Sequence, residues 1–89
     1  MRQASVTIVN RLGLHARPAA ELVKVSSRFR SRITLSMDEV EVDGKSIMGV
    51  MMLAAEEGST IRVRAQGPDE LDAVEALREL VEGKFGGEP

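Results

Sequence analysis

The spacing of hydrophobic residues predicts strands in four parts of the chain. Apolar and polar residues alternate in each part, which is the pattern of a strand with one buried face. The four segments are Ser5–Val9, Arg32–Met37, Val40–Asp43 and Thr60–Ala65. In the last segment Ile61, Val63 and Ala65 share one face and arginines occupy the other. Asp38 and Glu39 separate the second and third segments, so we expect these two strands to form a tight hairpin.

Three further segments have the three- and four-residue spacing of amphipathic helices. They are Pro18–Phe29, Ser46–Leu53 and Pro68–Glu82. Ser46 is a good N-cap residue for the second helix. The third helix has Pro68 at its expected first position, acidic residues just after it, and Gly83 beyond its end. We expect its buried stripe to consist of Leu71, Val74, Leu77 or Arg78, and Val81.

The order of these elements, β-α-β-β-α-β-α, predicts the fold class. Alternating strands and one-sided helices favour an α+β fold, in the form of a two-layer open-faced sandwich. In it, three helices cover one face of a four-stranded antiparallel sheet. The length of 89 residues predicts a single domain, residues 1–89. Residues 84–89 include two glycines and little that can pack, so we expect a flexible tail there.

The composition narrows the classes of function. A net charge of −2, two phenylalanines and no other aromatic residue argue against nucleic-acid binding. One histidine and no cysteine leave little from which to build a metal site, so we expect no metal and no cofactor. No apolar stretch is long enough for a membrane span or a signal peptide. We therefore expect a cytoplasmic protein that does not bind membranes.

The single histidine lies in the segment NRLGLHARPA, which starts at Asn10. The helix after His15 opens with Arg17 beside Pro18 and has no acid in its first turn, although the positive end of a helix favours acids. An anion would offset this, and the N–H groups of Ala16 and Arg17 are free to bind one. A neutral imidazole at such a site can accept a phosphoryl group. From these residues alone, a loop histidine beside a solvated arginine is an equal alternative.

The same segment resembles the phosphorylation-site signature of the HPr family, the histidine-containing phosphocarriers of the phosphoenolpyruvate-dependent phosphotransferase system. The resemblance covers essentially the whole chain and includes DGKSIMGVMML, from Asp43 to Leu53. It implies that His15 accepts a phosphoryl group on Nδ1 from phosphorylated enzyme I and donates it to EIIA domains for sugar uptake. It also implies that Arg17 stabilises the phosphate and that the carrier catalyses no turnover by itself.

Two other functions stay open beside this one. The nitrogen-related phosphocarrier paralogue of the same family has a regulatory output, and the motif at His15 does not separate it from the sugar carrier. A purely regulatory binding module, similar to HPr but lacking the histidine, is disfavoured because His15 is present.

The second predicted helix carries a candidate regulatory site at Ser46. A phosphate at a helix N-terminus is stabilised there, so phosphorylation of this residue is physically reasonable. The run KSIMGVM resembles HPr proteins of many Gram-positive bacteria, in which a dedicated HPr kinase phosphorylates the matching serine. The resemblance thus implies an HPr kinase/phosphorylase and a transcriptional regulator as further partners. The alternative is that Ser46 serves only as a helix cap.

The same helix has two apolar sides. One side carries Ile47, Met48 and Met51, and the opposite side carries Val50, Leu53 and Ala54. If the second side packs inward, the first is an exposed patch, and methionine suits a surface that docks on several partners. The alternative is that the methionines of this helix all belong to the core. It is stronger for Met52 than for Met48 and Met51.

Basic residues supply the remaining candidates for partner contact. Lys24 and Lys45 are expected to border the site and to favour acidic partner surfaces. We expect the carrier to act as a monomer that meets each partner transiently.

Overall fold

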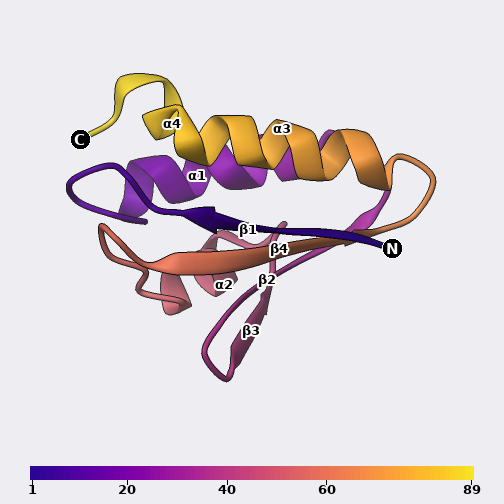
Figure 1. Ribbon diagram of the computed structural model, residues 1–89, viewed down its shortest axis with the longest axis horizontal. Helices are drawn as coiled ribbons and strands as arrows, with labels where there is room; N and C mark the ends of the chain where they lie inside the picture. The colour runs from indigo at the N-terminus through magenta and orange to yellow at the C-terminus, as the bar shows by residue number, and fades with distance from the viewer.

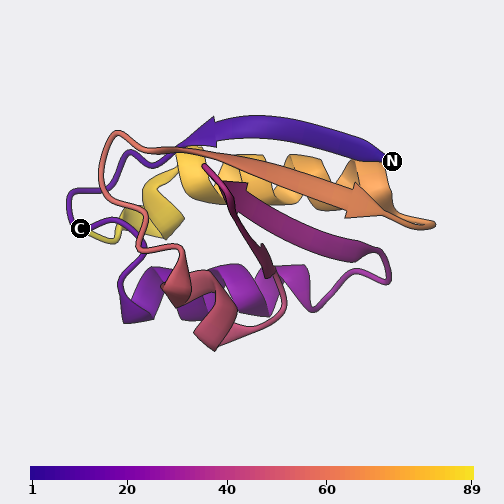
Figure 2. The same cartoon turned by 90° about the horizontal axis from the view of Figure 1, so that it is seen from below.

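The computed structural model describes all 89 residues. Its elements are β1 (Arg2–Thr7), α1 (Ala16–Ser26), β2 (Arg32–Met37), β3 (Val40–Asp43), α2 (Ile47–Met52), β4 (Thr60–Gln66), α3 (Glu70–Glu82) and α4 (Lys84–Gly87). The strands form one antiparallel sheet in the order β1-β4-β2-β3, which confirms the predicted α+β sandwich. Figure 1 shows α1 and α3 side by side over one face of the sheet. In Figure 2, α2 lies beside α1, close to the edge strand β3.

The alternation of apolar residues places the core as the sequence predicts. Val6, Ile33, Leu35, Ile61 and Val63 all point to the helix side and are almost completely buried. The bounds of β2 and β3 agree with the prediction, and β4 is one residue longer. The first strand begins at residue 2 instead of 5 and ends at 7, because its pairing with β4 extends over that whole range. None of the helices is long and apolar enough to cross a membrane.

Helix α1 differs from the prediction at both ends. It begins at Ala16, two residues before Pro18, which takes the third helical position. Proline is tolerated there because an N–H at that position has no acceptor inside the helix. The helix ends at Ser26 instead of Phe29, since the N–H groups of Arg28 and Phe29 bond to carbonyl groups three residues back, at 3.1 and 3.2 Å. This closer spacing tightens the chain into a turn.

Helix α3 begins later than expected. Its N-cap is Asp69, so Pro68 precedes the helix and the prediction of Pro68 as its first residue is wrong. Leu71, predicted to be buried, is 50% exposed. Ala73 and Leu77 are both fully buried and turn the apolar stripe away from Leu71.

The last residues pack more than the sequence suggests. Phe85, in the short helix α4, is buried in the core. The chain reaches this position through positive φ angles at Lys84 (56°) and Phe85 (53°). The expected absence of packing in residues 84–89 is therefore wrong for Phe85. Figure 1 shows that the chain then ends beside the loop that precedes α1.

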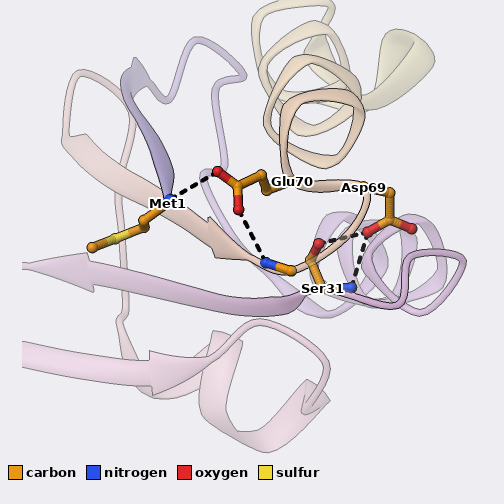
Figure 3. A network of polar contacts seen from close by, with 5 residues as sticks. Met1, Ser31, Asp69 and Glu70 are labelled. Carbon is orange, nitrogen blue, oxygen red and sulfur yellow. Dashed lines mark hydrogen bonds and ion pairs between the residues drawn. The ribbon is translucent and has the colours of Figure 1, made fainter.

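A polar network holds the opposite end of the molecule together (Figure 3). The carboxylate of Asp69 accepts hydrogen bonds from the Ser31 hydroxyl (2.6 Å) and the Ser31 N–H (2.9 Å), and from the Arg30 N–H (2.9 Å). Hydrogen bonds to the ionised form, the largest from the Ser31 side chain, lower the pKa of Asp69 to about 2. Asp69 thus joins the start of α3 to the turn between α1 and β2.

The neighbouring acid extends this network to the first strand. The carboxylate of Glu70 accepts from the Gly67 N–H at 3.2 Å and pairs with the amino group of Met1 at 2.8 Å (Figure 3). Both contacts favour the ionised carboxylate, with the Met1 amino group the larger cause, and they lower the pKa of Glu70. Glu70 therefore connects the start of α3 to Met1, just before β1, and to Gly67, just after β4.

The pKa of Asp69 predicts how stability depends on pH. Because its value falls from 3.8 to about 2 on folding, its hydrogen bonds stabilise the protein fully above pH 4. This stabilisation is lost as the pH falls from about 4 to about 2. We expect Asp69→Asn to unfold more easily at neutral pH and to lack this part of the pH dependence. Urea unfolding at a series of pH values measures both effects.

Ser31→Ala is the matched variant for this test, because it removes the largest single cause of the shift. It should show part of the Asp69→Asn effect. A pH profile of Asp69→Asn parallel to that of the parent protein would contradict the assignment.

Candidate functional site

The loop before α1 has little freedom, because it approaches another part of the backbone closely. The N–H of Leu14 donates to the carbonyl of Ala55 at 2.9 Å, and the side chain of Leu14 is buried. Gly13 has φ +66°, and a Cβ atom there would lie 2.3 Å from the same Ala55 oxygen. Only glycine fits this position, since it tolerates both the backbone angle and the close approach. The loop therefore delivers His15 to a fixed place.

His15 is the N-cap residue of α1. Its backbone is extended, its carbonyl accepts from the Ala19 N–H at 3.0 Å, and its ring makes no capping bond. The N–H groups of Ala16 and Arg17 therefore have no acceptor within the helix, and the first turn contains no acid. The half-buried ring thus stands at a helix end with two free donors. Anion binding by those donors, which the sequence predicts, stays a prediction.

Arg17 projects from this helix end into solvent. Its side chain is 81% exposed, and its Nε atom lies 3.6 Å from a carboxylate oxygen of Glu88. The Glu88 side chain is only 19% exposed, but the guanidinium is largely solvated, and a pair at this distance contributes little to stability. The guanidinium can therefore exchange Glu88 for another anion at low cost.

The end of the chain also contacts the histidine ring. The main-chain oxygen of Pro89 lies 3.3 Å from Nε2 of His15. The amide nitrogen of Asn10 donates to that oxygen at 3.0 Å and to the Gly13 carbonyl at 2.7 Å. These contacts were missed by the sequence analysis. The only sequence signal of these contacts is the polar Asn10 directly after the first strand pattern. Nothing in the sequence links Asn10 to residues 88 and 89.

Comparison with known proteins identifies the family of the chain. A family model described as the PTS HPr component phosphorylation site matches residues 2–83. The chain belongs to the HPr family. Phosphocarrier protein HPr of Xylella fastidiosa is 53% identical over 85 residues, which cover 96% of each chain. That of Cupriavidus necator is 49% identical over 86 residues, 97% of each chain. A crystal structure of HPr from Thermoanaerobacter tengcongensis matches with a TM-score of 0.95 and 44% identity over the full length of both chains.

In this HPr-family chain, Ser46 is the N-cap of α2. Its hydroxyl oxygen accepts from the Gly49 N–H at 3.1 Å, which confirms the capping role that the sequence predicts. The side chain is half-buried, so part of it faces solvent. No contact in the structure tests the regulatory role.

The side of α2 that faces outward is apolar. Val50 and Leu53 are buried as predicted, whereas Ala54 is exposed instead of packing with them. We call the exposed side chains the methionine patch, which consists of Ile47, Met48, Met51 and Met52. Met52 is 71% exposed, so the alternative that it belongs to the core is wrong. The patch lies on the helix that packs beside α1 (Figure 2).

The two candidate lysines differ in their surroundings. Lys24 is exposed in the last turn of α1. The ammonium of Lys45 donates to the Phe29 carbonyl at 2.7 Å, just after that helix. Lys45 therefore supports the local structure, and only Lys24 is free of such a contact.

The close approach at Gly13 leads to a stability prediction. Gly13→Ala places a non-glycine residue at positive φ, which costs about 1–2 kcal/mol, and adds a clash with the Ala55 oxygen. Gly58→Ala is the matched control, because its φ is +88° but a Cβ atom there would meet nothing within 4 Å. We expect denaturant unfolding to show a larger loss for Gly13→Ala than for Gly58→Ala. Equal losses would contradict the proposed clash.

Proposed function

We propose that this chain carries phosphoryl groups through His15, from phosphorylated enzyme I to EIIA domains that serve sugar uptake. The observation that supports this most strongly is the position of His15 at the start of α1, next to two free N–H groups and two residues before the exposed Arg17. In the forward step the Nδ1 lone pair attacks phosphorus, and the bond from phosphorus to enzyme I breaks. In the second step an acceptor on the EIIA domain attacks, and the N–P bond breaks.

The helix end provides reversible binding of the phosphoryl group. The N–H groups of Ala16 and Arg17 and the guanidinium donate to phosphate oxygens, and the helix dipole favours their negative charge. These groups stabilise the phosphate without forming a covalent bond to it. The only bond that must break for onward transfer is therefore the labile N–P bond.

The surface around the site fits brief docking on several proteins. The methionine patch offers an adaptable apolar contact, and Lys24 and Arg17 are exposed cations that favour acidic partner surfaces. The proposal places the carrier in the cytoplasm as a monomer. Lys45 contributes at most its charge, because its ammonium already donates to a carbonyl.

Incubation with phosphoenolpyruvate and enzyme I tests the carrier function. We expect mass spectrometry to show the gain of one acid-labile phosphate, and His15→Ala to show none. Arg17→Ala should slow the transfer by roughly 10- to 150-fold, the loss expected for a hydrogen bond to a charged group. Arg28→Ala, which removes an exposed cation from the turn after the opposite end of α1, should transfer at the parent rate. Transfer that survives His15→Ala would refute the carrier function.

The nitrogen-related branch of the family is the second candidate. The same phosphorylated protein can be offered to EIIA domains of the sugar branch and of the nitrogen branch. Faster transfer to the nitrogen-branch domain would assign the chain to that regulatory system and leave the role of His15 unchanged.

We further propose that phosphorylation of Ser46 regulates docking, because this residue adjoins the methionine patch at the start of α2. An HPr kinase with ATP should add one phosphate to the parent protein and none to Ser46→Ala. Ser46→Ala also loses the cap, at about 0.5–2 kcal/mol, whereas Ser46→Asn keeps a capping oxygen but offers no hydroxyl. Transfer from enzyme I should therefore be normal in Ser46→Asn. Phosphate that persists in Ser46→Ala would rule out this serine.

A further inference from the structure

The contact between His15 and Pro89 defines which ring nitrogen carries the proton. The main-chain oxygen of Pro89 has no hydrogen to donate, so the 3.3 Å contact is a hydrogen bond only if Nε2 of His15 carries a proton. In a neutral ring the other nitrogen, Nδ1, then holds a free lone pair. The contact thus selects one tautomer of the ring in the unphosphorylated protein.

Asn10 holds the oxygen that makes this contact. Its side-chain nitrogen donates both to the Pro89 oxygen and to the Gly13 carbonyl, and the residue is only 1% exposed. The amide therefore links the loop that leads to His15 with the far end of the chain. Its own oxygen is buried without a partner, which costs free energy. What Asn10 contributes is the pair of hydrogen bonds from its nitrogen.

The segment that carries Pro89 is also held in two other places. The buried Phe85 ring fixes its start, and the Glu88 N–H donates to the Lys84 carbonyl at 2.8 Å. The Glu88 carboxylate then lies near Arg17 on the other side of the site. Between these contacts the backbone passes through Gly86 and Gly87, with φ +78° and +109°. Residues 85–89 form a strap across the His15 end of the molecule.

We propose that Asn10 is a positioning residue, which holds this strap so that the Pro89 oxygen keeps the proton of His15 on Nε2 and leaves Nδ1 as the nucleophile. The inference rests on the proposed phosphoryl transfer and supplies a reason for the Nδ1 site that the family resemblance implies. It concerns the unphosphorylated protein, so it can be tested in the absence of any partner.

The strap also keeps the Nε2 proton of His15 in place during phosphoryl transfer. The Nδ1 lone pair forms the bond to phosphorus as the bond to the donor breaks, and the Nε2 proton stays where it is. Because the ring keeps the Nε2 proton, it carries a positive charge once Nδ1 is phosphorylated, and the Pro89 oxygen then accepts from a more polar N–H. When the phosphoryl group leaves, the N–P electron pair returns to Nδ1. No proton transfer is needed in either direction.

Nuclear magnetic resonance of the ¹⁵N-labelled full chain tests the proposal. At a pH where the ring is neutral, Nε2 of the parent protein should appear as the protonated nitrogen and Nδ1 as the unprotonated one. In Asn10→Ala the ratio of the two tautomers should shift toward Nδ1–H by roughly two- to tenfold, the effect of losing one neutral hydrogen bond. The initial rate of phosphorylation by enzyme I should fall in proportion to the remaining Nε2–H fraction.

A second variant releases the strap without changing the core. Gly87→Val puts a β-branched residue where φ is +109°, a backbone angle that such residues rarely adopt, while a Cβ atom there meets nothing within 4 Å. Gly87→Val should shift the tautomer ratio of His15 in the same direction as Asn10→Ala. If Asn10→Ala does not fold, Gly87→Val still tests whether the strap selects the tautomer. Ser31→Ala loses a hydrogen bond at the opposite end of the molecule, so it is the control for a loss of stability alone. The tautomer ratio of its His15 ring should equal that of the parent protein.

The outcomes separate this inference from the proposed function. An unchanged tautomer ratio in a folded Asn10→Ala would overturn the role of Asn10. A parent ring protonated on Nδ1, or an unchanged ratio in Gly87→Val, would overturn the role of the strap. Absence of phosphorylation in a protein with the expected tautomer would refute the carrier function and leave the strap intact.

Discussion

The close contact between the loop before α1 and the segment after α2 is the constraint on which the functional site depends. The Leu14 N–H bonds to the Ala55 carbonyl, and the same oxygen leaves no room for a side chain at Gly13. One backbone contact thus fixes both the place of His15 and the distance from it to the helix that carries the methionine patch. The proposed carrier function needs such a link, because in it the histidine and the methionine patch meet the partner at the same time.

Local patterns predicted most of the fold. The alternation in β2 and β3 gave their bounds correctly, and Ser46 was identified as a cap because N-capping depends only on neighbouring residues. The errors arose where a tertiary partner decided the structure. The Asp69 carboxylate accepts a hydrogen bond from Ser31, which lies in another turn. Helix α3 therefore starts after Asp69, and Pro68 is not its first residue. Phe85 is buried by a turn at positive φ, which no periodicity reveals.

The site was predictable only in the part that is contiguous in the sequence. His15, Arg17 and the free N–H groups follow from a short motif and from the absence of acids after it. Asn10 and Pro89 are 79 positions apart, and their contact depends on how α4 redirects the chain. A hydrogen bond between a loop and a tail leaves no spacing rule in the sequence. The residues that contact the ring of His15 and the oxygen beside it therefore become visible only in three dimensions.

The two long helices use the same electrostatic property in opposite ways. Helix α3 has Glu70 and Asp72 in its first turn, so its positive end is compensated within the chain. Helix α1 has no acid there, and the Glu88 carboxylate contacts the Arg17 guanidinium and not the free N–H groups. The first turn of α1 thus contains no acid to offset the positive end of the helix, and in the proposed function an external anion supplies that charge. A phosphoryl group that must arrive and leave is suited to this end, because no side chain of the protein has to be displaced from those N–H groups to admit it.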